Sequence, residues 1–102
     1  MHRRILFLVS AAGILAAPVA QADEALLKKH NCIACHQIDK KLVGPAYKDV
    51  AKKYKGQKDI AAKLAEKVKK GGQGAWGPVP MPPNAQIPDA DNRKMVEYIL
   101  SL

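Results

Sequence analysis

The stretch KHNCIACHQI, residues 29–38, holds the only two cysteines of this 102-residue chain, and a histidine directly follows the second one. Residues at positions i and i+3 of a helical turn lie on the same face. A turn over this stretch therefore presents the thiols of Cys32 and Cys35 in one direction, with the imidazole of His36 beside them. Because all three groups sit on one turn, we expect the fold to be organised around whatever they hold.

The pattern C-x-x-C-H is typical of the attachment site for a c-type haem. Cys32 and Cys35 each form a thioether with one vinyl group at the same edge of the porphyrin, and His36 then lies under the ring and binds the iron. The motif predicts one haem c, covalent through Cys32 and Cys35, with His36 as an axial ligand.

Two other uses of this stretch remain open from the motif alone. A redox-active disulfide of the thioredoxin type normally begins a helix that follows a strand, and strand patterns are nearly absent here. A structural zinc site draws its ligands from two separated segments, whereas His30, Cys32, Cys35 and His36 are crowded into seven residues. Both alternatives fit the chain less well than haem attachment.

Residues 1–22 have the features of a cleaved secretory signal peptide. Arg3 and Arg4 give a positive start, residues 5–17 form an apolar run, and Ala20-Gln21-Ala22 is a small-residue cleavage site. The apolar run is too short to span a bilayer, which disfavours a retained membrane anchor. We expect cleavage after Ala22, a periplasmic location, a single domain over residues 23–102, and no membrane insertion of the mature chain.

The predicted mature chain is small and basic. With Arg3 and Arg4 removed, 15 of the 17 Lys and Arg remain against nine Asp and Glu, a formal charge of +6, and 14 of the 15 are lysine. Nucleic-acid readers generally rely on arginine, so we expect no nucleic-acid binding and instead transient docking to acidic redox partner proteins. A domain of 80 residues often needs a covalent or bound staple, which the haem provides.

Hydrophobic spacing predicts four helices and an all-α class. The expected segments are Asp23 to about His30, with Asp23 as cap; Ala46 to Tyr54, after Pro45; Asp59 to about residue 70, before Gly71; and the segment opened by Pro88-Asp89, with Met95, Val96, Ile99 and Leu100 on its buried face. Residues 37–45 and the Pro-rich 71–88 are expected to be structured loops.

The sixth ligand of the iron decides between an electron carrier and a protein that binds small ligands at an open iron. Met95 falls on the apolar face of the last helix, where core packing explains it. Met81 lies between Pro80 and Pro82, whose restricted backbone can hold a thioether at the iron with little loss of entropy. We therefore expect Met81 to be the second axial ligand.

The runs CIACHQIDKKLVGPAYKDVAKKYKGQ, residues 32–57, and GGQGAWGPVPMPPNA, residues 71–85, resemble the small bacterial class I cytochromes c of the cytochrome c-551 family. The resemblance covers essentially the whole chain after residue 22. It implies a compact class I cytochrome c fold, about four helices wrapped around one covalently attached haem, and a monomeric electron carrier that is not an enzyme.

The resemblance also implies roles for residues around the iron. His36 and Met81 are the axial ligands, the Pro45 carbonyl accepts a hydrogen bond from the His36 ring, Trp76 binds a haem propionate, and Asn84 orients the Met81 sulfur. Asn31 stands where the family often has glycine, and asparagine tolerates the left-handed backbone better than most residues. His30 is expected to point to solvent.

The family further implies a shuttle for single electrons between respiratory complexes, for example from a quinol-oxidising complex to a nitrite reductase or terminal oxidase. Apolar groups at the haem edge, such as Val43, Pro45, Val79 and Pro82, are expected to form the contact, with lysines steering the partner. Two alternatives are a haem enzyme or gas sensor with an open iron, and a module docked permanently in a larger complex. The scarcity of acid–base groups near Met81 disfavours the first, and the lysine-rich surface disfavours the second.

Overall fold

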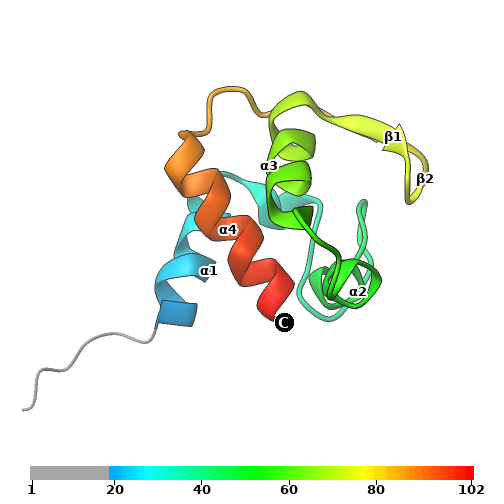
Figure 1. Cartoon of the computed structure of the whole chain (residues 1–102). Helices are drawn as coiled ribbons and strands as arrows, with labels where there is room; N and C mark the ends of the chain where they lie inside the picture. Colours follow the sequence, from blue (N-terminus) through cyan, green and yellow to red (C-terminus); the bar gives the residue numbers. More distant parts are fainter. Residues whose placement is uncertain (1–18) are drawn as a thin grey trace, which may run out of the picture.

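A computed structural model describes residues 19–102, with side chains from residue 23 onward. Four α-helices and a short hairpin make up the described chain (Figure 1). The elements are α1 (Val19–Lys29), a 3₁₀ turn η1 (Cys32–Ala34), α2 (Tyr47–Tyr54), α3 (Ile60–Lys70), β1 (Gly72–Gly74), β2 (Gly77–Met81) and α4 (Asp89–Ser101). The prediction of a mainly helical fold with four helices is confirmed.

Helix α4 is the centre of the packing, because it contacts α1, α2 and α3. Its buried residues include Met95, Val96 and Ile99, while Leu100 is half-buried. Met95 and Ile99 pack in one cluster with Leu27 of α1, Tyr47 of α2 and Ile87, which precedes α4. The apolar face predicted for the last helix therefore holds the other three helices together.

The helix ends follow the local sequence. Helix α2 has Asp49 in its first turn and Lys52 and Lys53 in its last, and α4 begins with Asp89 and Asp91; these charges complement the helix dipole. Gly71 ends α3 with a positive φ of 70°, a conformation that glycine adopts without strain. Asp59 precedes α3 as expected, but its backbone is left-handed and its side chain caps nothing.

The first helix differs from expectation at its start. Helix α1 begins at Val19 rather than at Asp23, so in the full chain Asp23 lies inside the helix and is not its cap. Most of the predicted signal peptide, residues 1–18, lies outside the described residues. Over the part of the chain that is described, no helix has the length and apolar character needed to cross a bilayer.

The left-handed residue Asn31, with φ of 63°, joins α1 to η1. This conformation turns the chain sharply between the end of α1 and the cysteines. Its backbone amide donates to Lys28 O at 3.1 Å, and Ala34 N donates to Asn31 O at 3.2 Å. The backbone prediction made for Asn31 is confirmed.

The antiparallel hairpin of β1 and β2 was not expected from the sequence. Glycine and proline are both depleted in strands, and residues 72–81 contain three glycines and two prolines. The pairing joins Gly72 to Met81 and Gly74 to Gly77, with an irregularity between these pairs. Both strands are exposed edge strands. The missing N–H groups of Pro78 and Pro80 are tolerated there, because an edge strand does not need every N–H to donate to a neighbouring strand.

Gly71→Ala is expected to destabilise the protein more than Gly56→Ala. Both glycines have positive φ, 70° and 78°, so each alanine carries a backbone penalty of about 1 kcal/mol. At Gly71 the added Cβ also collides with the backbone of Met81 to Pro83, lying 2.8 Å from Pro83 N, whereas at Gly56 it meets nothing within 4 Å. Urea unfolding measures the free energy of unfolding of each variant. Equal values for the two variants would show that the backbone of residues 81–83 moves aside at no cost.

Candidate haem site

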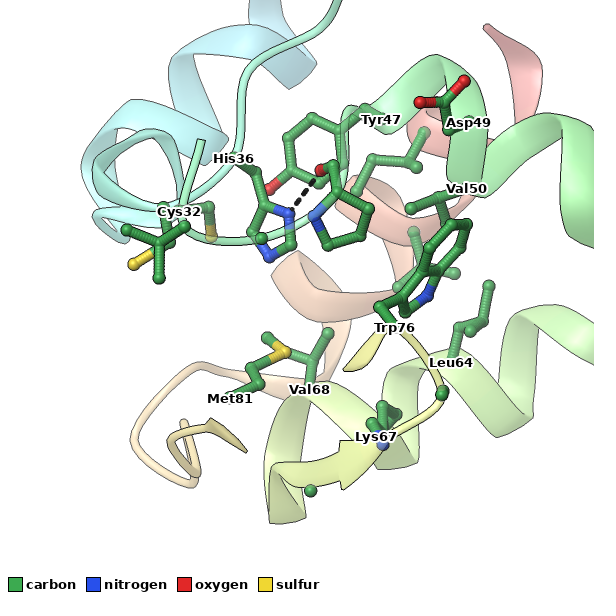
Figure 2. Close-up of a pocket in the computed structure, with 18 of the residues that line it drawn as sticks. Cys32, His36, Tyr47, Asp49, Val50, Leu64, Lys67, Val68, Trp76 and Met81 are labelled. Carbon is green, nitrogen blue, oxygen red and sulfur yellow. Dashed lines mark hydrogen bonds between the residues drawn. The ribbon is translucent and has the colours of Figure 1, made fainter. Parts of the chain in front are cut away.

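One large cavity lies between the C-x-x-C-H turn, the two middle helices and the hairpin. Its volume is about 840 Å³, within the range of roughly 300–1,000 Å³ typical of small-molecule and cofactor sites. Figure 2 shows apolar side chains of α2 and α3, among them Val50, Leu64 and Val68, projecting into it. The cavity thus combines an apolar wall with the candidate ligands described next.

Cys32 and Cys35 both line this cavity as half-buried free thiols. The turn between them is closed by hydrogen bonds to Cys32 O from Cys35 N at 3.2 Å and from His36 N at 3.0 Å, so both thiols and the imidazole belong to one turn. Burial raises the pKa of the Cys32 thiol, whereas redox-active C-x-x-C cysteines have a lowered pKa. The cysteine turn η1 also follows helix α1 and not a strand, so the structure disfavours the thioredoxin-type alternative.

The imidazole of His36 is oriented by a backbone carbonyl. Its Nδ1 lies 2.8 Å from Pro45 O, and because a carbonyl can only accept, Nδ1 carries the proton and donates. Nε2 then has a free lone pair, the form in which histidine binds metals. The hydrogen bond implied by the resemblance for Pro45 is present in the structure.

Two neighbours confine the His36 ring further. Tyr47 stacks on it with ring centroids 4.9 Å apart and an interplanar angle of 16°. At Gly44 an added Cβ would stand 2.5 Å from His36 Cε1 and 2.8 Å from Nδ1, so only glycine lets this loop approach the ring. Burial also raises the pKa of Tyr47, which keeps the phenol neutral beside the imidazole.

Met81 lies on the side of the cavity across from His36 (Figure 2). It is the last residue of β2, is half-buried, and pairs with Gly72 across the hairpin. The rival methionine, Met95, also reaches the cavity wall, but its side chain is packed in the core cluster with Leu27 and Tyr47. Met81 therefore lies where it could reach a group in the cavity, and Met95 is placed as a core residue, as expected.

Trp76 lies in the hairpin turn, and Asn84 lies three residues after the end of β2. Trp76 lines the cavity, is 40% exposed, and meets Tyr54 edge to face with centroids 6.5 Å apart. The Asn84 amide donates to Pro82 O at 3.0 Å, and its backbone N–H donates to Val68 O at 3.0 Å. Its expected action on the Met81 sulfur stays a prediction.

His30 does not point to solvent as expected. Its Nε2 lies 3.0 Å from Asp91 Oδ2, and the two side chains are only 12% and 24% exposed. The ring bridges the end of α1 to the first turn of α4. Within residues 23–102 no three His, Cys, Asp or Glu side chains gather as a metal site, so the zinc alternative finds no support.

A haem fits these residues. The two thiols at one rim match the two vinyl groups of one porphyrin edge, and His36 offers a free Nε2 into an apolar cavity of suitable volume. Gly44 lets the loop backbone pass close to the His36 ring, which would help to fix the imidazole that binds the iron. Trp76 and the half-buried Lys67 are donors on the wall able to meet the carboxylates of the haem.

A mainly helical fold with a C-x-x-C-H turn facing an apolar cavity defines a c-type cytochrome. The cytochrome c family model matches residues 21–102. Cytochrome c-552 of Nitrosomonas europaea is 52% identical over 93 residues, covering 91% of this chain and 90% of that one. Cytochrome c-551 of Pseudomonas aeruginosa is 50% identical over 93 residues, covering 89% and 88%.

The solved structures agree with the sequences. The crystal structure of wild-type Nitrosomonas europaea cytochrome c552 superimposes with a TM-score of 0.75, at 52% identity, covering 78% of this chain and 98% of that one. The chain belongs to the class I cytochromes c of the c-551/c-552 family. It is a monohaem electron carrier and not an enzyme, and Cys32 and Cys35 bind haem c covalently.

Several residues of the site were not identified from the sequence. Gly44 comes directly before Pro45 and Tyr47 follows two residues after it. Because Pro45 was expected to contact the His36 ring, its neighbours in the sequence could also have been expected near that ring. Lys53 lies over the Trp76 ring, 4.5 Å from its centroid. That contact joins residues 23 positions apart and has no signature in the spacing of the sequence.

Replacing both cysteines, Cys32→Ala with Cys35→Ala, is expected to abolish cooperative folding. Among residues 23–102 only eight apolar residues are buried, and the haem supplies the apolar contacts that complete this core. Circular dichroism and thermal melting provide the measurement, with Ile33→Ala, an exposed change in the same turn, as the control that keeps the haem. Native helicity with a cooperative melt in the double variant would contradict this account.

Proposed function

We propose that this protein is a periplasmic carrier of single electrons between respiratory complexes, with His36 and Met81 as the axial ligands of its haem. The observation that carries the proposal is the orientation of His36 by Pro45, with Met81 across the same cavity (Figure 2). A thioether in the sixth position saturates the iron and raises its reduction potential. Both properties suit a carrier.

The bound haem supplies the redox change, an iron that alternates between ferric and ferrous. The chain supplies fixed ligands. His36 is held by Pro45 O and by the Tyr47 ring, and Met81 ends a strand whose proline residues restrict φ. Ligands that move little between the two iron states keep the reorganisation accompanying transfer small.

The charge distribution supports an acidic partner. Residues 48–70 contain nine lysines against three acidic residues, a formal +6, while residues 23–47 and 71–102 together balance six basic against six acidic residues. The whole net charge of the predicted mature chain therefore lies on α2, α3 and the link between them. A net charge concentrated on one segment in this way can steer an acidic partner from a distance.

Apolar side chains at the rim of the cavity supply the contact itself. Leu42, Val43 and Val79 are 47%, 52% and 60% exposed and all line the cavity. They lie on loop 37–45 and on β2, the two segments that flank the cavity. A small apolar contact surrounded by charge is typical of transient redox encounters, and we propose that electrons pass here between this monomer and its partners.

The respiratory role and the location are proposed together. We infer that residues 1–22 are a signal peptide removed after Ala22, which the family match beginning at residue 21 supports. In the periplasm the carrier would shuttle electrons between respiratory complexes, for example from a quinol-oxidising complex to a nitrite reductase or terminal oxidase.

Met81→Ala is expected to abolish the near-infrared sulfur-to-iron band of the oxidised protein and to open the reduced iron to carbon monoxide. The thioether of Met81 is the proposed sixth ligand, and alanine offers no replacement. Met95→Leu keeps the apolar volume of the core methionine and is expected to retain the band. Optical spectra of the two variants provide the measurement. A band that survives in Met81→Ala but is lost in Met95→Leu would overturn the assignment of Met81 as the sixth ligand.

Lys55→Glu is expected to slow electron transfer from a reduced acidic flavodoxin roughly three- to tenfold at low salt, and raising the salt should reduce this difference. Lys94→Glu, on α4 and outside residues 48–70, makes the same change in net charge and is expected to slow transfer less. Stopped-flow rates over a range of ionic strength provide the measurement. Equal effects of the two variants would leave net charge, not its placement, as the cause.

A further inference from the structure

The hairpin that ends in Met81 has little packing of its own. Residues 72–80 are exposed, and the two strands contact mainly each other. The base of the hairpin is fixed by the end of α3, where Gly71 N donates to Lys67 O at 2.7 Å, and by the segment after β2, where Asn84 N donates to Val68 O. Within residues 19–102, the turn at Ala75 and Trp76, at the far end, has no such backbone link.

A single side chain ties this turn to α2. Lys53 Nζ donates to Ala75 O at 3.1 Å and lies over the Trp76 ring, 4.5 Å from its centroid. Among residues 23–102 this is the only hydrogen bond from the hairpin turn to another element. Tyr54, the next residue of α2, makes an edge-to-face contact with the same indole. Helix α2 therefore contacts both the backbone and the aromatic ring of the turn.

The strand between the turn and Met81 is short and stiff. β2 runs Gly-Pro-Val-Pro-Met, and φ is fixed at both Pro78 and Pro80. A stiff strand of five residues transmits a displacement of the turn to Met81 instead of absorbing it. Fixing the turn on α2 therefore also limits how far the Met81 thioether can withdraw from the cavity.

We propose that Lys53 is a positioning residue of the redox site: by holding Ala75 O and the Trp76 ring against α2, it fixes the hairpin and keeps the Met81 thioether in place. This role rests on the proposed function of Met81 as axial ligand. Lys53 itself stays outside the ligand set. It acts through a cation–π contact and a charge-assisted hydrogen bond, which are more specific than the lysine's charge alone.

The test compares three variants of the haem-loaded protein. Lys53→Met keeps the length of the side chain but removes the cation and the donor; Lys53→Arg keeps both; Lys52→Met makes the same charge change at the neighbouring exposed lysine of α2, which lies outside the contacts above. The readouts are the affinity of the ferric protein for added imidazole, which displaces the methionine, and the hydrogen-exchange rates of amides in residues 72–81.

We expect Lys53→Met to bind imidazole roughly three- to tenfold more tightly and to exchange its hairpin amides faster by a similar factor, from the loss of one hydrogen bond and one cation–π contact. Lys53→Arg and Lys52→Met should remain within about twofold of the unsubstituted protein. Equal values for Lys53→Met and Lys52→Met on both readouts would overturn the proposal.

The unsubstituted protein separates this proposal from the one on which it rests. If its oxidised form lacks the near-infrared sulfur-to-iron band, Met81 is no ligand and both proposals fall. If the band is present and Lys53→Met changes neither readout, only the role of Lys53 falls.

Discussion

The hydrogen bond from His36 Nδ1 to Pro45 O, at 2.8 Å, is the constraint around which this side of the molecule is built. For the carbonyl to reach the ring, loop 37–45 must fold back onto the cysteine turn. Gly44 N donates to Cys35 O at 2.8 Å, and Tyr47 N donates to Gln37 O at 2.8 Å, so the far end of the loop is tied back to the turn and to the loop's own first residue. The same course of the backbone places the Tyr47 ring against the imidazole. Because Nδ1 is held by a backbone carbonyl, the backbone also sets the direction in which Nε2 points.

The two walls of the cavity are made rigid in different ways. The His36 wall is rigid because its backbone groups are paired and Tyr47 is buried. The Met81 wall has exposed strands and cannot use burial. There, rigidity comes from prolines that restrict φ, and from Gly71, whose missing Cβ lets the end of α3 approach the backbone of residues 81–83. A thioether is a weak ligand, so restraint of the surrounding backbone matters more for Met81 than for His36.

Much of this arrangement was predictable because it is local. Helical spacing gave α2, α3 and α4 to within a residue or so, and the C-x-x-C-H motif gave the turn and the cofactor. The hairpin was missed because glycine and proline argue against strands, and the pairings of Gly72 with Met81 and of Gly74 with Gly77 override that preference. The His30–Asp91 contact spans 61 positions and the Lys53–Ala75 hydrogen bond spans 22; such long-range partners are set by how helices pack, which no local pattern records.

The proposed association with an acidic partner accounts for the placement of the lysines better than stability does. Nine lysines on residues 48–70 repel one another, and the ion pairs of this segment, Lys48–Asp39, Lys69–Asp89 and Lys70–Glu66, are all solvent-exposed. Exposed pairs of this kind contribute little to folding, so they do not explain why the charge is concentrated. A field that reaches beyond the surface does. Because α2 also holds the hairpin turn through the hydrogen bond from Lys53 to Ala75 O, the helix that carries part of the basic charge is joined to the hairpin that bears Val79. A partner drawn to the lysines would therefore arrive beside the cavity.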